Sequence, residues 1–428
     1  MLKKRFCNIC TKILIIFFIL IILAFSLSGC TSRQSINDLA YVIGIGIDVG
    51  ETNELKLSLQ ISKTNNSSSS SGSSQSSDTI VNSVECSSIT SGISLFNSYL
   101  GKEVNMAHCK VIVFSEEMAS KGISEHLYTL VNNIQIHAEA NMIICKSTAE
   151  DFLNNSTPIL ETLSAKYYEI ASSTSEYTGY TDSITFGEFF SYYTDTFQEA
   201  YAILGGINKN TGDSDTFDTF FNSDTDITEY IDISSSDNTY IAGEVPSTSD
   251  ISIDNMGLAV FHSDKLVGEL NAIETICHMI VTNKLNRCII RIPSPINIDE
   301  YLDLNIRLVS KPKVKVDLIN NTPYIKVSIK VNARLLSMTE DSNDLSANNN
   351  KELENYISKY LEENIKNYLY KTAKELGSDI AGFGRYAVSN FLTWDDWISY
   401  NWNEKYADSF FNVEVESYLK SAYLLIDS

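Results

Sequence analysis

The first 30 residues constrain this chain most, because they decide on which side of a membrane the rest must fold. Lys3, Lys4, Arg5 and Lys12 precede or open an apolar run over residues 13–27, and no acidic residue comes before it. A basic start followed by such a run is typical of a secretory signal peptide. The run is shorter than the roughly 20 residues that a membrane-spanning helix needs.

The apolar run ends in the sequence Leu-Ser-Gly-Cys, residues 27–30, which has the form of a bacterial lipobox. We expect cleavage of the signal peptide, residues 1–29, and attachment of a diacylglycerol lipid to the Cys30 thiol. Each buried CH₂ of an acyl chain contributes about 0.8 kcal/mol, so two chains hold a folded domain at a bilayer far better than one. The mature protein is then anchored without spanning, through a tether at residues 30–37. An uncleaved signal anchor is the alternative.

Charge excludes nucleic acid as a partner. Loss of the four basic residues within 1–29 takes the formal net charge from −22 to −26, and such a surface repels nucleic acid and anionic headgroups. The lipid rather than a basic patch therefore provides membrane attachment. Beyond Cys30 the cysteines are odd in number and form no CxxC pair, which argues against a disulfide framework or a zinc site. They are Cys86, Cys109, Cys145, Cys277 and Cys288.

Residues 38–205 show strand and helix periods in alternation, which predicts an N-terminal α/β domain. An apolar strand at 40–48 is followed at 54–62 by alternating Leu/Ile and polar residues, the period of a half-buried strand. A Ser-rich stretch at 65–77 is expected to be a flexible loop. Helical period follows at 89–100, and apolar strands at 109–114 and 140–145. The sequence from Ser147 to Glu150 fits a capping box.

Residues 206–285 are expected to form a middle domain that contains a long acidic segment at 208–254. Within that segment, residues 222–226 with Glu229 have few features of a calcium loop and are interpreted as a solvated acidic loop. A strand, a tight turn and a second strand follow at 256–270. Asn271 and Glu274 then predict the capped start of a short helix.

Residues 286–428 predict a C-terminal α+β domain in which an antiparallel sheet is covered by one long helix. Strands are expected at 313–318 and 324–336, around a turn at 320–323. Apolar residues of helical period then run from 351 to 376, before Gly377. The expected fold class is therefore mixed α/β and α+β, with three domains of mixed sheets and packed helices.

The sequence contains no GxSxG, HExxH, Walker A or complete GxGxxG motif. The five histidines show no i, i+4 pairing, so they are interpreted as structural or exposed. We predict no catalytic residue, metal or cofactor apart from the lipid on Cys30. The loop at 379–384 has two interpretations. Its glycines permit tight turns while Phe383 packs inward, or Asp379, Gly382, Phe383 and Gly384 form a subunit contact.

Besides the lipobox, the chain contains the segments NDLAYVIGIGID (37–48), SITSGISLF (88–96), HCKVIVF (108–114), GLAVFHSDKLVGEL (257–270), SDIAGFGRY (378–386) and WNEKYADSFFNVEVE (402–416). In these segments the chain resembles the Ger(x)C family, the C subunits of nutrient germinant receptors of spore-forming bacteria. The resemblance is cumulative and covers almost the whole mature chain, although Thr31 to Arg33 and Ala381 depart from residues common in the family.

The resemblance implies a non-enzymatic, three-domain protein on the outer face of the spore inner membrane. Its partners would be an A subunit and a polytopic B subunit of the receptor. The B subunit is the favoured germinant binder, and the C subunit would support assembly or signal transmission. Two other functions are kept as alternatives: a solute-binding lipoprotein of a transporter, and an anchored hydrolase that uses scattered carboxylates.

Overall fold

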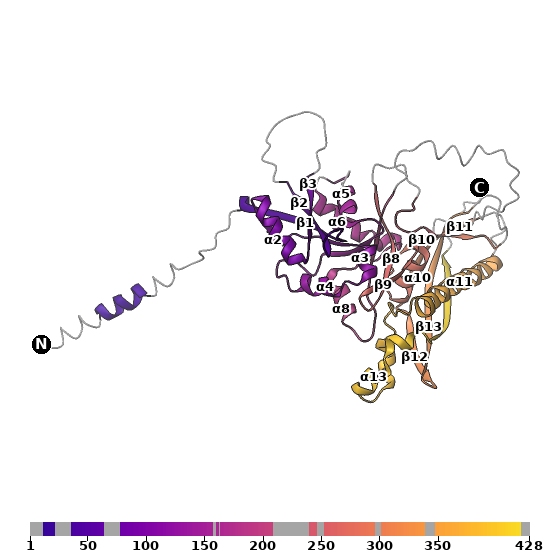
Figure 1. The fold of residues 1–428 in the computed structure, drawn as a ribbon. Helices are drawn as coiled ribbons and strands as arrows, with labels where there is room; N and C mark the ends of the chain where they lie inside the picture. Colours follow the sequence, from indigo (N-terminus) through magenta and orange to yellow (C-terminus); the bar gives the residue numbers. More distant parts are fainter. Residues whose placement is uncertain are drawn as a thin grey trace, which may run out of the picture.

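The computed structural model describes residues 12–21, 36–63, 78–156, 160–161, 163–208, 239–245, 252–295, 301–338 and 347–420. Two β-sheets with their helices lie next to each other (Figure 1). Residues 12–21 form a helix, and no helix within the described ranges is long and apolar enough to cross a membrane. Cys30, the Ser-rich loop at 65–77 and most of the acidic segment at 208–254 lie outside the described residues.

The first sheet has nine strands among the described residues, in the order β3-β2-β1-β5-β6-β7-β8-β9, with β4 paired to β1. Its centre is parallel, from β1 through β5 and β6 to β7, and both sides continue antiparallel. The strands are β1 (Leu39–Val49), β2 (Leu55–Ser62), β3 (Thr79–Cys86), β4 (Glu103–Asn105), β5 (Val111–Ser115), β6 (Asn141–Cys145), β7 (Tyr201–Ile207), β8 (Ile253–His262) and β9 (Lys265–Leu270).

Helices pack on this sheet, and several of them begin at side-chain caps. Ser88 forms a capping box with Ser91, and Gly101, with φ of 66°, ends the same helix. The expected cap at Ser147 is wrong by one residue, because Thr148 accepts the hydrogen bond from Asp151 N. The helical elements are η1 (Ile36–Asp38), α2 (Ile89–Leu100), α3 (Glu116–Lys121), α4 (Ser124–Val131), α5 (Ala149–Asn155), α6 (Ser164–Ser173), α7 (Ser175–Thr178), α8 (Phe186–Tyr193) and α10 (Ala272–Val281).

The expectation that β2 is half-buried is wrong, because both of its faces are covered. Ser58 and Gln60 on the polar face are 0% and 1% exposed. Gln60 accepts a hydrogen bond from the Tyr168 hydroxyl of α6 at 2.8 Å and donates to Leu153 O of α5 at 3.3 Å. Polar side chains of this strand are therefore buried with partners, which keeps the cost of their desolvation low.

The second sheet has the order β10-β11-β13-β12, and β14 pairs with the other side of β13. Neighbouring strands of this sheet are antiparallel, except that β14 runs parallel to β13. The strands are β10 (Cys288–Pro293), β11 (Tyr301–Leu308), β12 (Lys313–Ile319), β13 (Thr322–Met338) and β14 (Phe410–Lys420); the helical elements are α11 (Ala347–Tyr370), the π turn η3 (Lys371–Glu375), α12 (Gly384–Ala387), η4 (Val388–Asn390), α13 (Trp394–Tyr400) and α14 (Trp402–Tyr406).

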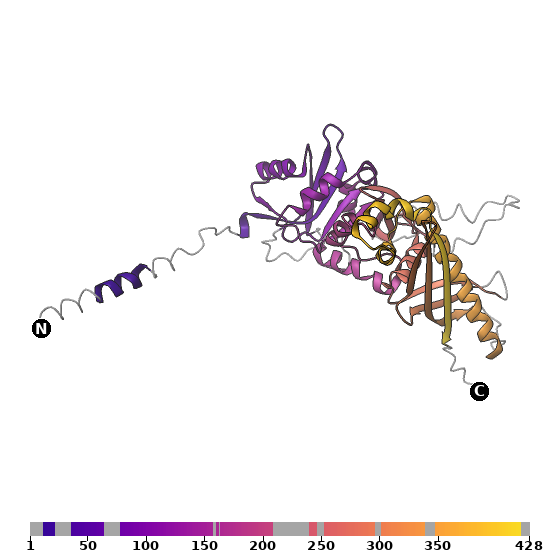
Figure 2. The ribbon, with the colours of Figure 1, turned by 90° about the horizontal axis from the view of Figure 1, so that it is seen from below.

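The long helix α11 covers the apolar face of the second sheet, as its periodicity predicts (Figure 2). Leu353, Ile357, Leu361 and Ile365 are buried at successive four-residue steps. The same core contains the alternate apolar residues of β13, of which Val327 and Val331 are 0% exposed. The mixed fold class and the helix-covered C-terminal sheet are thus confirmed.

Strand pairing places β8 and β9 in the first sheet, next to β7. Residue 206, the expected start of a middle domain, lies inside β7. The helix after β9, α10, lies against α11, and Lys371 Nζ of η3 is 2.7 Å from Glu274 Oε2 of α10. Residues between 253 and 281 therefore link the two sheets.

Candidate functional site

The loop at residues 378–384 joins the second half of the chain to the first sheet. Ser378 Oγ donates to Phe261 O of β8 at 2.6 Å, and Glu199 N donates to Asp379 O at 3.0 Å. Gln198 Nε2 donates to Ile380 O at 2.9 Å. We call residues 378–384, together with Gln198, Glu199 and Phe261, the joint.

Asp379 organises the joint from a fully buried position. Its Oδ1 accepts from Gly382 N at 2.9 Å, and its Oδ2 accepts from Gly384 N at 3.0 Å and from Trp402 Nε1 at 2.8 Å. Burial raises the pKa of the Asp379 carboxyl to about 6, while these three hydrogen bonds act in the opposite direction. No Lys, Arg or His of the described chain forms an ion pair with it, so hydrogen bonds alone compensate its charge.

The two glycines of the joint meet steric demands that other residues cannot. Gly382 has φ of 73°, a left-handed conformation that costs L-residues energy. A Cβ on Gly384 would lie 2.5 Å from Phe197 O, closer than atoms can approach without movement of the backbone. Phe383 is 1% exposed, with its ring 6.3 Å from that of Tyr406. The interpretation of the loop as tight turns around an inward Phe383 agrees with this geometry.

Asp379, Gly382, Phe383 and Gly384 are all buried against the chain itself. Their contact with another subunit stays a prediction, and it would have to act through exposed neighbours. Tyr386 is 38% exposed and Arg385 is also exposed. Arg385 Nη2 lies 3.3 Å from Asp195 Oδ2, which adds a further link from α12 to the segment before β7.

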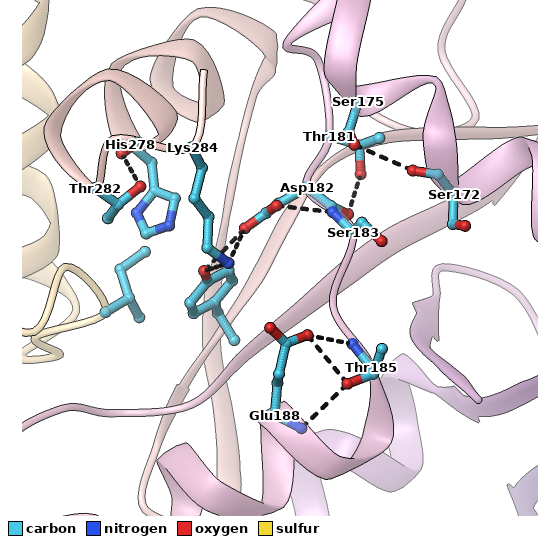
Figure 3. Close-up of polar contacts among 12 residues, drawn as sticks. Ser172, Ser175, Thr181, Asp182, Ser183, Thr185, Glu188, His278, Thr282 and Lys284 are labelled. Carbon is cyan, nitrogen blue, oxygen red and sulfur yellow. Dashed lines mark hydrogen bonds and ion pairs between the residues drawn. The ribbon is translucent and has the colours of Figure 1, made fainter. Parts of the chain in front are cut away.

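A second, largely buried polar cluster links the first sheet to the end of α10, and Figure 3 shows Asp182, His278 and Lys284 of this cluster. Lys284 Nζ lies 2.7 Å from Asp182 Oδ2 and 2.9 Å from the Tyr201 hydroxyl. The Tyr201 hydroxyl donates to the same Asp182 oxygen at 2.9 Å. Sequence reasoning missed this cluster because Asp182 and Lys284 are 102 positions apart. No motif of fixed spacing joins them.

His278 continues this cluster into the second half of the molecule. Its ring packs edge-to-face on Tyr201, with centroids 4.6 Å apart, and its Nδ1 lies 2.8 Å from the Tyr368 hydroxyl of α11. Burial lowers the pKa of His278 to about 3, so the imidazole is neutral at physiological pH. Its Nε2 has no hydrogen-bond partner in the described part of the chain. A neutral, enclosed imidazole of this kind supports packing between α10, α11 and β7.

A cavity of about 590 Å³ lies at the carboxyl ends of β1, β5 and β6, and Asp48 lines it. The Asp48 carboxylate accepts hydrogen bonds from Ala149 N and Glu150 N, at 2.7 and 3.0 Å, so it serves the start of α5. Lys146, also in the lining, is 3.0 Å from Glu269. No group of three potential metal ligands occurs within the described ranges.

The cysteines behave as small core residues. Cys86, Cys109, Cys145, Cys277 and Cys288 are each unpaired and buried. Burial raises the pKa of the Cys109 and Cys288 thiols to about 12, so neither is a ready nucleophile at neutral pH. Cys30 lies outside the described residues, and its lipidation stays a prediction.

Two family descriptions match the chain in succession. "Spore germination protein N-terminal domain" matches residues 32–205, and "Spore germination B3/ GerAC like, C-terminal" matches residues 256–422. The "Putative spore germination protein YfkR" of Bacillus subtilis (strain 168) is 25% identical over 132 residues, which are 30% of this chain and 34% of that protein. The chain thus aligns with about a third of the length of this relative.

A solved structure has a similar fold. "Crystal Structure of the GerBC protein" aligns with a TM-score of 0.50 and 16% identity, and the match covers 88% of this chain and 96% of that one. At this identity the similarity concerns the fold alone. Its coverage includes both sheets rather than one of them.

Proposed function

Because the chain belongs to the Ger(x)C family of spore germination proteins, we propose that it is a non-enzymatic subunit of a spore germinant receptor complex. The observation that carries this proposal is the succession of two spore germination domains, which together cover most of the chain in order. The joint also supports this proposal. A subunit that supports assembly of a complex or transmits a signal benefits when its two sheets are held in a fixed position relative to each other.

We further propose that a diacylglycerol lipid on Cys30 attaches the protein to the outer face of the spore inner membrane. The lipobox at residues 27–30 supports this anchor. The described fold begins at Ile36, six residues later. At 3.3–3.6 Å per residue those residues span at most roughly 20 Å, so the anchor would hold the start of β1 close to the bilayer surface.

The proposed partners are the A subunit and the polytopic B subunit of the receptor. In this arrangement the B subunit binds the germinant, and this chain supports assembly or passes on the signal. The fully hydrogen-bonded Asp379 and the cluster around Lys284 favour transmission through a rigid body, because buried charged networks resist partial opening.

A pull-down tests the proposal. The tagged full-length chain is recovered from spore inner membrane in mild detergent, and the co-purified proteins are identified by mass spectrometry. Receptor A and B subunits are the expected result, together with loss of nutrient-triggered germination when the gene is deleted. Recovery of a transporter permease and ATPase instead would favour a solute-binding lipoprotein and overturn the receptor assignment.

A further inference from the structure

Three large apolar side chains are exposed together where α13 begins. Leu392 is 99% exposed, Trp394 55% and Ile398 48%. Trp394 and Ile398 are four positions apart on one helix and therefore lie on the same face. In Figure 1, α13 lies at the lower end of the molecule, beside β12. We call Leu392, Trp394, Ile398, Asp395 and Asp396 the α13 tip.

The α13 tip stands on a rigid base. Trp397, which follows Trp394 by three positions on α13 and points into the molecule, is 1% exposed, and its Nε1 donates to Thr196 Oγ1 at 3.2 Å. Its ring lies 5.5 Å from that of Phe391 and 6.0 Å from that of Trp402. A partner would therefore meet side chains whose backbone is already fixed, which lowers the entropy lost on binding.

Clustered exposure of this kind indicates a binding surface. Single exposed apolar residues are common on protein surfaces, but an aromatic residue grouped with two aliphatic ones is typical of interaction sites. Tryptophan is among the residues that most often dominate binding energy at interfaces. The only ring contact of Trp394 within the described chain is with Phe197, at 5.8 Å, so much of the indole faces solvent.

Charge distinguishes a protein partner from a lipid surface. Asp395 and Asp396 are exposed in the first turn of α13, and neither forms an ion pair within the described ranges. Insertion of the tip into a bilayer would bring both carboxylates to anionic headgroups, which repel them. Lysine or arginine side chains at the border of a protein groove would instead attract them.

We propose that the α13 tip docks into an apolar groove, bordered by lysine or arginine side chains, on another subunit of the receptor. This inference rests on the proposed function. Two successive contacts connect α13 to the joint: the ring of Trp397 packs on that of Trp402, and Trp402 Nε1 donates a hydrogen bond to Asp379. Docking at the tip would therefore take place close to the residues that hold the two sheets together.

The test compares tagged full-length variants in spores. Trp394→Ser with Ile398→Ser removes the apolar tip. The matched control, Tyr99→Ser with Ile289→Ser, changes residues of similar exposure, 53% and 49%, on α2 and β10. Loss of two hot-spot side chains is expected to lower the recovered receptor subunits about tenfold or more. The control is expected to recover as much as the unmodified chain.

A charge variant guards against misfolding as an explanation. Asp395→Lys with Asp396→Lys leaves the apolar side chains in place and should also lower the recovery, because it brings like charges together. If the serine and lysine variants both recover receptor subunits as well as the unmodified chain, the docking proposal is overturned while the proposed function stands. If the unmodified chain recovers none, the proposed function itself fails.

Photocross-linking identifies what covers the tip. A benzophenone amino acid replaces Trp394, and in a parallel protein Tyr99, in intact spore membranes. A cross-link from position 394 to a receptor subunit supports the proposal. Cross-links from 394 to lipid only, or to a second copy of this chain, would overturn it in favour of membrane insertion or self-association.

Discussion

At the scale of single residues, Asp379 couples the fold to pH. Its folded pKa of about 6 lies above the ordinary value of 3.8. An acid with a raised folded pKa holds its proton more tightly in the folded state. The resulting contribution to stability is fully present below about pH 4 and is lost as the pH rises through about 6.

Asp379→Asn should therefore flatten the pH dependence of unfolding. Between pH 4 and pH 7, the free energy of unfolding of the unmodified protein is expected to fall by about 2 kcal/mol relative to that of the variant. Urea denaturation at several pH values measures this difference. Trp402→Phe, which removes the indole donor to Asp379, should move the transition to higher pH. A difference between the unmodified and Asn proteins that stays constant with pH would contradict the argument.

At the scale of elements, α11 protects the open edge of the second sheet. Val415 N of β14 donates to Glu362 Oε1 at 2.9 Å, and Ser417 N donates to Ser358 Oγ at 3.1 Å. Leu419 N donates to Glu354 Oε1 at 2.8 Å. Residues four apart on α11 are separated by about 6 Å along the helix, and residues two apart on β14 by about 6.6 Å along the strand. Because these spacings are similar, each of the three α11 side chains meets one edge amide of β14.

Glu354→Ala with Glu362→Ala should lower stability and expose the edge. Each half-buried amide left without an acceptor is expected to cost about 1 kcal/mol, and an open edge strand favours aggregation. Glu354→Gln with Glu362→Gln keeps an acceptor oxygen at both positions and provides the matched control. Denaturant midpoints and light scattering measure the two effects. If the Ala and Gln variants had equal denaturant midpoints and equal light scattering, the side-chain acceptors for the β14 amides would be unimportant.

At the scale of the whole molecule, we expect anchoring and folding to be separable. The described core starts at residue 36, beyond the proposed lipidation site at Cys30. The net negative charge of the sequence disfavours attachment to anionic lipid by charge alone, so the proposed lipid would be the main attachment.

Cys30→Ala is therefore expected to leave the thermal unfolding midpoint unchanged and to release the protein from the membrane fraction. Two acyl chains contribute about 0.8 kcal/mol for every buried CH₂, so their loss should remove most membrane affinity. Fractionation of cells that lack the other receptor subunits measures retention by the lipid alone. A lowered unfolding midpoint, or full retention in those cells, would be the contrary result.

Much of this fold and little of its joint could be predicted from the sequence. Hydrophobic period located β1 and α11, and the capping residues located the start of α10, because these signals lie within a few neighbouring residues. The alternation in β2 predicts a half-buried strand, and this prediction is wrong. The residues that cover its polar face, Leu153 and Tyr168, lie about 100 positions away from Gln60 in the sequence. The loop at 379–384 was recognised from its glycines, but its acceptors and donors could not be identified.

The sequence by itself determined the periods of strands and helices, the helix caps, the lipobox and the acidic charge of this protein. Only the tertiary structure decided that Asp379 binds Trp402, that Lys284 meets Asp182, and that α13 leaves Trp394 exposed. Local signals act through bonds between neighbours along the chain, whereas these contacts exist only after distant segments have packed. Which side chains are buried, paired or exposed is therefore set by the arrangement of the two sheets.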